Sequence, residues 1–429
     1  MEIAIFWFRR DLRINDNLGL HQALKSGFPV LPLFIFDRHI VRELPSDDAR
    51  ISFIFQQLEK INNELAKTNA SLLVKNGEPF AVWQELVNTY SIKAVFANHD
   101  YEPYAIDRDS QISRLLLENG ISLFTFKDQV IFEKSDILKS DGQPYTVFTP
   151  FKNKWLEKFK FQSDCQTFDN KPLLANFLKK AFHFPSLQEI GFTKNNISAP
   201  DFLAGNIEDY ELSREIPWMD KTTHIGPHLR FGTVSIREIV KIAFEKSPVF
   251  LSELIWREFF MMILYHFPQV VNRSFKPKFE RIKWLNNEEE FEKWKSGKTG
   301  YPLVDAGMRQ LNETGFMHNR VRMVTASFLC KHLLIDWRWG EAWFAEKLLD
   351  YELSSNNGNW QWAAGTGCDA TPYFRVFNPT TQLQKFDPEM KYVNKWLPEL
   401  YELSYPSPIV EHNSARERAI LTYKNALNS

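Results

Sequence analysis

The chain has 429 residues, of which 44% are hydrophobic and 24% charged, and its formal net charge is −1. This composition excludes a collagen-like or disordered chain, and a net charge near zero neither requires nor excludes nucleic acid as a partner. The length predicts two domains, because a single hydrophobic core rarely serves more than about 250–300 residues.

The first part of the chain alternates short apolar runs with segments of helical periodicity. The runs predicted as strands are 3–8, 30–36, 71–77, 93–100 and 121–126. Helical segments, such as 51–67 and 106–120, lie between them. This alternation predicts an α/β domain over residues 1–130, with a five-stranded parallel, Rossmann-like sheet between two layers of helices. No GxGxxG follows the first run, so we expect no dinucleotide there.

The rest of the chain has a different pattern. Residues 131–199 are irregular and rich in Phe, Lys and Pro, which is typical of an inter-domain connector. Beyond them strand-like alternation is scarce, and an all-helical domain is predicted over residues 200–429. Its clearest helical runs are 234–247, 249–267, 303–315, 320–337 and 341–353.

Cysteine content and hydropathy indicate the cellular setting. Cys165, Cys330 and Cys368 lie far apart, without the spacing of a zinc site, so we expect neither a disulfide framework nor a metal. Arg9 and Arg10 come too early for a signal peptide, and no apolar run approaches transmembrane length. We therefore expect a cytoplasmic protein that does not bind membranes.

Two stretches of the helical part leave two interpretations open. On a helix, Glu253, Trp256 and Arg257 share one face, which is either an exposed ion pair beside a core tryptophan or a recognition surface. Hydroxyl side chains at Thr222 and Thr223 precede Gly226 and a predicted helix. That stretch is either an ordinary capped helix start or an anion site built from backbone N–H groups.

The stretch SSNNGNWQWAAGTG, residues 354–367, combines two tryptophans, three asparagines and three glycines without a charged side chain. It indicates a neutral, amide-rich, aromatic pocket with no nucleophile. No Ser/His/Asp or HExxH arrangement occurs elsewhere, and a lone His318 near a helix start is more typical of a structural residue. Trp284, Trp337 and Trp360 are either core filler or an electron-hopping chain, and their spacing leaves both open.

Several long strings give the sequence a family pattern. FWFRRDLRINDN lies near the start, PYTVFTPFKNKW lies in the connector, and the helical part contains KTGYPLVDAGMRQLNETGFMHNRVRM, LLIDWRWGEAWF, NNGNWQWAAGTG and YFRVFNPTTQLQKFDP. Together they resemble the photolyase/cryptochrome family over essentially the whole chain, and within it the class I cyclobutane pyrimidine dimer photolyases.

This resemblance implies light-driven DNA repair by a carbon–carbon lyase. Reduced FAD, folded inside the helical domain and excited by blue or near-UV light, would donate an electron to a flipped-out cyclobutane pyrimidine dimer and split it into two pyrimidines. The implied partner is damaged DNA, and the implied state is a monomer with no obligate protein partner.

The resemblance also implies the residues that bind FAD. By motif position they are Tyr210, Thr222, Thr223, His224, Ile225 and Gly226 around the phosphates, and Phe250, Arg257, Arg322, Asp350, Tyr351, Glu352 and Asn356 on the rest of the cofactor. Gly226 stands where the family often has Ser, and Glu352 where Asp is more frequent. Asn356 would face flavin N5 and accept a hydrogen bond from N5–H. Plant cryptochromes typically have Asp there, so Asn356 favours repair.

The remaining implied residues serve the lesion, electron transfer and light harvesting. Trp256 and Trp362 would stack on the lesion, which Glu253, Asn319 and Met323 would also contact, while Arg214, Arg320 and Gln382 would hold the DNA. The catalytic set comprises Glu253, Asn356 and the photoreduction chain Trp360, Trp337 and Trp284. Glu102 matches an antenna contact of folate-binding members, but the second contact falls near Val270 and Val271, which are apolar. Methenyltetrahydrofolate, a flavin or deazaflavin, or no antenna all stay open.

Two alternative functions follow from the same resemblance. A cryptochrome would signal in blue light without repair, but such proteins commonly have a long tail, and here a short charged segment, residues 410–429, follows the helical pattern. Repair of (6-4) photoproducts uses paired histidines, whereas here Asn319 follows a single His318. We rank dimer repair first, signalling second and (6-4) repair third.

Overall fold

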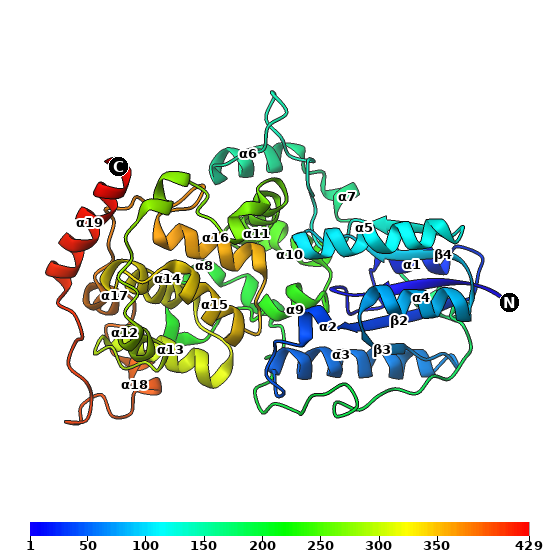
Figure 1. Ribbon diagram of the computed structural model, residues 1–429, viewed down its shortest axis with the longest axis horizontal. Helices are drawn as coiled ribbons and strands as arrows, with labels where there is room; N and C mark the ends of the chain where they lie inside the picture. The colour runs from blue at the N-terminus through cyan, green and yellow to red at the C-terminus, as the bar shows by residue number, and fades with distance from the viewer. Residues whose placement is uncertain (429) are drawn as a thin grey trace. The chain divides into compact units, whose positions relative to one another are not determined.

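The computed structural model describes residues 1–428 and contains two compact units that interleave along the chain (Figure 1). The first unit comprises Met1–Asp136, Lys158–Asp201 and Ile225–Phe244. The second comprises Ile137–Glu157, Phe202–His224 and the described chain from Glu245 onward. The domain limits expected from the sequence, at residues 130 and 199, stay a prediction.

The first unit is built on a five-stranded sheet in which every strand pair is parallel, as predicted. The strand order is β3-β2-β1-β4-β5. The strands are β1 (Glu2–Phe8), β2 (Val30–Asp37), β3 (Leu73–Gly77), β4 (Ser91–Asn98) and β5 (Ser122–Phe126). All five strands of residues 1–428 belong to this unit, which confirms the predicted fold class.

The central strand β1 shows why the sheet is covered on both faces. Its side chains alternate, and residues 4, 6 and 8 pack with α1 (Leu18–Leu24) and α3 (Ala49–Ala66). Residues 3, 5 and 7 pack with α4 (Pro79–Thr89) and α5 (Pro103–Glu118). Because both sets are apolar, β1 reads as a continuous hydrophobic run, as expected for a strand buried on both faces.

Short helices complete the first unit. They are α2 (Arg38–Val41), α7 (Phe161–Asp164), the 3₁₀ turn Lys171–Asn176, α9 (Gly226–Phe231) and α10 (Ile236–Lys246). At the start of α10, Arg237 forms ion pairs with Asp16 and Asp128, and Arg13 pairs with Asp128 at 2.7 Å. These four side chains are at most 9% exposed. A buried network therefore ties α10 to the loop that follows β1.

The second unit is helical, as predicted. Its helices are α6 (Phe148–Lys158), α8 (Tyr210–Ser213), α11 (Pro248–His266), α12 (Glu288–Lys295), α13 (Pro302–Thr314), α14 (Asn319–Ser327), α15 (Trp337–Lys347), α16 (Leu353–Ala364), α17 (Pro379–Phe386), α18 (Lys391–Trp396) and α19 (His412–Asn428). A π-helical turn, Phe328–His332, extends α14, and 3₁₀ turns occupy Ala204–Ile207, Pro217–Met219, Pro268–Val271 and Pro277–Arg281. Within residues 1–428 no helix combines the length and the apolar character needed to cross a membrane.

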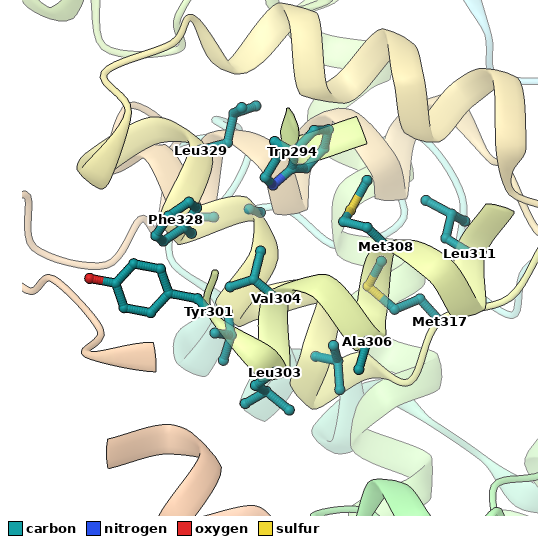
Figure 2. Packing of buried hydrophobic residues seen from close by; sticks show 14 of the residues in the cluster. Trp294, Tyr301, Leu303, Val304, Ala306, Met308, Leu311, Met317, Phe328 and Leu329 are labelled. Atoms are coloured by element: carbon teal, nitrogen blue, oxygen red, sulfur yellow. The ribbon is translucent and has the colours of Figure 1, made fainter. Parts of the chain in front are cut away.

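The core of the second unit is dense and aromatic. Figure 2 labels Trp294, Leu329, Met308 and Met317 among the buried residues of this core. Helix α16 packs against α11, α14 and α15. The close approach of α16 to α11 requires glycine at position 358, because a Cβ at Gly358 would collide with the ring of Phe260. The helix therefore lies close to α11, and this fixes the positions of the side chains that it carries.

Candidate active site

Three helices of the second unit carry eleven of the predicted site residues. Helix α11 carries Phe250, Glu253, Trp256 and Arg257, α14 carries Asn319, Arg320, Arg322 and Met323, and α16 carries Asn356, Trp360 and Trp362. Because α16 packs on both α11 and α14, these residues belong to one region although about 110 positions of sequence separate the extremes. Gln382 lies half-buried on α17, which packs against α13.

Asn356 is held by a residue that the sequence did not identify. Its Nδ2 donates hydrogen bonds to the backbone oxygen of Glu341, at 3.1 Å, and to Glu341 Oε1, at 2.8 Å. Burial raises the pKa of Glu341, although the bond from Asn356 opposes this rise. With its donor end bound to Glu341, Asn356 presents its carbonyl end as the acceptor for a ligand.

Two ion pairs involve the acidic residues implied for the flavin. Arg322 forms a two-pronged pair with Asp350, with distances of 3.2 and 2.9 Å, and its Nε also donates to the backbone oxygen of Met317. Arg257 donates to Glu352 at 2.9 Å, and the Ser355 hydroxyl donates to the same carboxylate at 3.1 Å. Glu352, which replaces the more frequent Asp, is therefore held between α11 and the start of α16.

The stretch proposed for the FAD phosphates contains unsatisfied polar atoms. Thr222 Oγ1 and His224 Nδ1 are buried and have no hydrogen-bond partner among residues 1–428. His224 also adopts a left-handed backbone conformation, with φ of 52°, and Thr223 is buried. Buried polar groups without a partner cost free energy, so a bound polar ligand is a physical reason for them. Tyr210 begins α8, and its ring packs edge-on against Phe250.

The chain continues from this stretch into the first unit. Ile225 and Gly226 lie at the start of α9, which has only six residues, and Ile225 is buried. Tyr351, between Asp350 and Glu352, is half-buried and packs against the core of the second unit. The FAD roles of these three residues stay predictions.

The two predicted stacking tryptophans occupy different surroundings. Trp256 lies flat against Phe148 of α6, with ring centroids 3.6 Å apart and an interplanar angle of 8°. Phe148 lies in the connector, and its string PYTVFTPFKNKW was part of the family pattern, but its contact with Trp256 could not be read from the sequence. Trp362 is half-buried on α16. Phe148 thus fixes the orientation of the Trp256 ring.

His318 has a structural role in this region. It is the N-cap of α14, and its Nδ1 accepts a hydrogen bond from the backbone N–H of Arg320 at 3.2 Å. Burial, followed by the positive charges of Arg322, Arg320 and Arg214, lowers the pKa of His318 to about 4. A neutral ring can accept this bond, whereas an imidazolium cannot. The structural interpretation of His318 therefore accounts for its contacts.

The three tryptophans of the predicted photoreduction chain lie in one aromatic cluster. Trp337 and Trp360 are buried in it, and Trp284 packs against it, half-buried. The ring centroid of Trp360 lies 4.9 Å from that of Phe344 and 6.1 Å from that of Trp294. Trp294 was not among the predicted residues, because nothing in its sequence neighbourhood distinguishes it from core filler.

Glu102, predicted as an antenna contact, is engaged within the first unit. It stands at the N-cap position of α5 and accepts hydrogen bonds from Arg10 at 3.0 Å and from Arg230 at 2.9 Å. The region near Val270 and Val271 lies in the second unit, where the backbone oxygen of Val270 accepts bonds from Asn357 and Gln361. The antenna role of Glu102 stays a prediction. Within residues 1–428 no cluster of three or more metal-ligating side chains occurs.

Comparison with known proteins agrees with this fold. Residues 4–173 match a family model described as DNA photolyase, and residues 250–404 match one described as the FAD binding domain of DNA photolyase. The curated deoxyribodipyrimidine photo-lyase of Halobacterium salinarum is 36% identical, over 99% of both chains. That of Vibrio cholerae is also 36% identical, over 99% of this chain and 100% of the relative.

Solved structures show the same relationship. A bacterial class III photolyase from Agrobacterium tumefaciens matches with a TM-score of 0.89 and 32% identity, over 100% of this chain and 98% of that one. An archaeal photolyase from Sulfolobus tokodaii with two FAD molecules matches with a TM-score of 0.83 and 35% identity, over 99% of this chain and 100% of that one. A Synechocystis cryptochrome matches with a TM-score of 0.84 and 27% identity, over 98% of this chain and 99% of that one.

The fold and the site thus define a flavoprotein of the light-driven DNA repair class, and the chain belongs to the DNA photolyase family. The curated relatives confirm the predicted enzyme class, deoxyribodipyrimidine photo-lyase, and the matched FAD-binding domain confirms the predicted cofactor. The finer assignment to class I stays a prediction.

Proposed function

We propose that this chain splits cyclobutane pyrimidine dimers in DNA, using FAD held in the helical unit. The observation that carries the proposal is the neutral amide of Asn356, whose donor end is bound to Glu341 and whose acceptor end has no hydrogen-bond partner within residues 1–428. Bound FAD would supply the absorption of light and the electron that opens the dimer. The protein forms no covalent bond with the substrate in this scheme, which agrees with a sequence that has no Ser/His/Asp or HExxH arrangement.

The chain's own residues fit FAD at both ends. Thr222 Oγ1 and His224 Nδ1, both buried without partners in residues 1–428, would donate to phosphate oxygens. At the other end, Arg322 and Asp350 would contact the flavin as a pair, and Arg257 with Glu352 would support them. Phe250 supplies a buried aromatic wall beside Tyr210.

Asn356 would control the protonation of the flavin's central nitrogen. Its carbonyl oxygen would accept a hydrogen bond from N5–H and would bring no negative charge next to the ring. Glu341 keeps the amide in this orientation, because the two hydrogen bonds that Nδ2 donates to residues 1–428 both lead to it. Such an environment favours the reduced cofactor that repair requires.

Lesion recognition would depend on stacking and on the low free energy needed to take the damaged bases out of the duplex. Stacking of a base on an aromatic ring contributes about 1–3 kcal/mol, and Trp256 and Trp362 offer two such rings. Photolyases are among the enzymes that take their target out of the duplex, and a base that pairs poorly costs less to extract. Glu253, whose pKa is raised by burial against the opposing effect of Arg214, would bond to the edge of a pyrimidine.

The tryptophan cluster would restore the reduced cofactor after oxidation. Trp360 and Trp337 are buried, and half-buried Trp284 is the member of the predicted chain that reaches solvent. An electron path from solvent to the flavin would therefore run through aromatic rings of one cluster. This path serves activation of the cofactor and not each repair turnover.

The proposal extends to partners and location. We infer a monomeric, cytoplasmic enzyme whose macromolecular partner is damaged DNA. For the antenna, the alternatives are a folate that contacts Glu102, a flavin or deazaflavin, or no antenna. Absorption spectra of the purified protein before and after denaturation would identify the bound chromophores.

The proposal is tested by repair in light. Purified, reduced protein is mixed with duplexes that contain a cyclobutane dimer, a (6-4) photoproduct or no lesion, and each mixture is kept in blue light or in the dark. We expect loss of the cyclobutane dimer in light only. Dimers that persist in light, although FAD and DNA are bound, would favour the signalling alternative, and loss of the (6-4) lesion alone would favour the third function.

A further inference from the structure

Two arginines proposed to hold DNA are already bound to carboxylates of the same unit. Glu215 lies between them: its Oε1 is 3.5 Å from Arg214 Nε, and its Oε2 accepts from both Nε and Nη2 of Arg320. Arg214 also donates to Glu253 at 2.8 Å. We call these four residues the Arg214–Arg320 cluster. Two guanidinium groups and two carboxylates give it no net formal charge.

The four members differ in how firmly they are held. Arg320 also lies over the ring of Phe386, 4.3 Å from its centroid, and its Nη1 contacts Met323 Sδ. Arg214 lies 5.4 Å from the ring centroid of Tyr210. The side chain of Glu215 is 39% exposed, against 18% for Arg320 and 24% for Arg214. Its ion pairs with residues 1–428 are with these two arginines.

These contacts make Glu215 the exchangeable member of the cluster. If its carboxylate turns toward solvent, Phe386, Met323 and Tyr210 still hold the two guanidinium groups in place. The planar guanidinium fork binds carboxylate and phosphate with the same two-pronged geometry. The Glu215 carboxylate therefore occupies the position that a DNA phosphate would take on Arg320.

We propose that Glu215 is a specificity-determining residue, an internal competitor that a DNA phosphate must displace before Arg214 and Arg320 bind it. The inference rests on the proposed function, in which these arginines contact DNA. Undamaged DNA offers only phosphates, so it gains little from the exchange. A dimer adds stacking on Trp256 and Trp362, which offsets the exchange, and Glu215 thereby raises the preference for damaged over undamaged DNA.

The test compares two variants that change the net charge equally. Glu215→Gln removes the competing carboxylate. Glu211→Gln is the matched control, because Glu211 is exposed on α8 and forms no ion pair with the described residues 1–428. Dissociation constants are measured in the dark for a dimer-containing duplex and for the same duplex without the dimer, over a series of salt concentrations. FAD content, read from absorption, verifies that each variant is folded.

Glu215→Gln is expected to bind the undamaged duplex several-fold more tightly than Glu211→Gln does, with a smaller preference for the dimer. Each phosphate neutralised adds about 0.9 to the slope of log affinity against log salt. For the undamaged duplex, that slope should therefore be steeper by about one in Glu215→Gln than in Glu211→Gln. Glu215→Ala, which removes the carboxylate without leaving an amide, must give the same result if Glu215→Gln loses FAD.

Undamaged-duplex affinity in Glu215→Gln and Glu215→Ala that equals or falls below that of Glu211→Gln would overturn the inference, since Glu215 would then only position Arg320. Failure of the proposed function looks different. In that case the wild type itself would show no preference for the dimer, and the comparison on undamaged duplex would still decide the role of Glu215.

Discussion

The buried network of the first unit and the Arg214–Arg320 cluster of the second unit are built from the same groups, two arginines and two carboxylates each. In the first, Asp16 and Asp128 are 1% exposed, and Arg13 and Arg237 are at most 9% exposed. In the second, the side chains are between 18% and 39% exposed. Burial decides their use: the first network cannot exchange partners and holds the fold, whereas the second can exchange a carboxylate for a phosphate.

The largest expected effect comes from breaking the buried network. Asp128→Asn removes the carboxylate that Arg13 and Arg237 share and leaves buried positive charge without compensation, which typically costs about 3–5 kcal/mol. Urea unfolding should show such a loss. Glu253→Gln, in the half-exposed cluster, should change the free energy of unfolding by less than about 1 kcal/mol. Equal losses in the two variants would contradict the contrast between the networks.

Acid should abolish the difference between wild type and Asp128→Asn. Burial alone would raise the pKa of Asp128, but Arg13 and Arg237 outweigh it and lower that pKa. A carboxyl with a lowered folded pKa stabilises the protein above its unfolded value near 4, and this contribution is lost as the pH falls through the folded value. Unfolding of the two proteins should therefore begin to converge as the pH falls below about 4, and should coincide only below the lowered folded pKa of Asp128.

The second effect in size concerns His318, whose ring lies among the arginines of the second unit. The pKa of His318 is lowered to about 4, while an unfolded histidine takes up its proton near pH 6.5. The unfolded state thus binds more protons between these values, and stability falls as the pH drops from about 6.5 to about 4. His318→Asn keeps an N-cap side chain and should flatten this dependence in thermal unfolding.

The same variant separates a structural from a catalytic histidine. His318→Asn should still repair cyclobutane dimers at neutral pH, because the role of His318 is to cap α14. Retained pH dependence, or loss of repair with FAD still bound, would show that the cap is not its main function.

A third, smaller effect tests the proposed stacking of Trp256 on the lesion. Trp256→Ala removes one stacking ring and should weaken binding of a dimer-containing duplex by about 1–3 kcal/mol. Binding of undamaged duplex should hardly change, because phosphate contacts do not involve this ring. Fluorescence anisotropy titrations measure both, and unchanged affinity for the dimer would refute the assignment of Trp256.

The smallest effect on binding belongs to Trp337→Phe. Trp337 is buried in the aromatic cluster and is 1% exposed, so it offers no surface to DNA, and binding and repair by pre-reduced protein should be unchanged. Photoreduction of oxidised flavin, followed by absorption under blue light, should slow. Photoreduction at the wild-type rate would exclude Trp337 from the electron path.

Local pattern was enough to predict much of this molecule. The apolar runs of the sheet and the helical periods of the second part follow directly from side-chain spacing, and both are present. The family strings pointed to Arg322 and Asp350 as neighbours of one cofactor, and the structure pairs these two side chains. Contacts between distant segments could not be read in this way.

The residues that the sequence did not identify show why. Glu341 precedes Asn356 by fifteen positions and meets it only because α15 packs on α16. Phe148 reaches Trp256 across more than 100 positions. Glu215 is an ordinary glutamate in the sequence, and only the fold brings Arg320 of α14 to it, across 105 positions. In each case the chemistry depends on a tertiary contact and not on local spacing.

The central claim is that a dimer docks on the face formed by α11, α14 and α16 and is split there by light. The most direct measurement is dimer loss under continuous blue light, with reduced wild type and Trp256→Ala side by side over a range of DNA concentrations. The wild type should turn over many dimers per protein, and the variant should approach the same rate only at much higher DNA concentration. A wild type that retains FAD and binds the damaged duplex but leaves its dimers intact would contradict the claim.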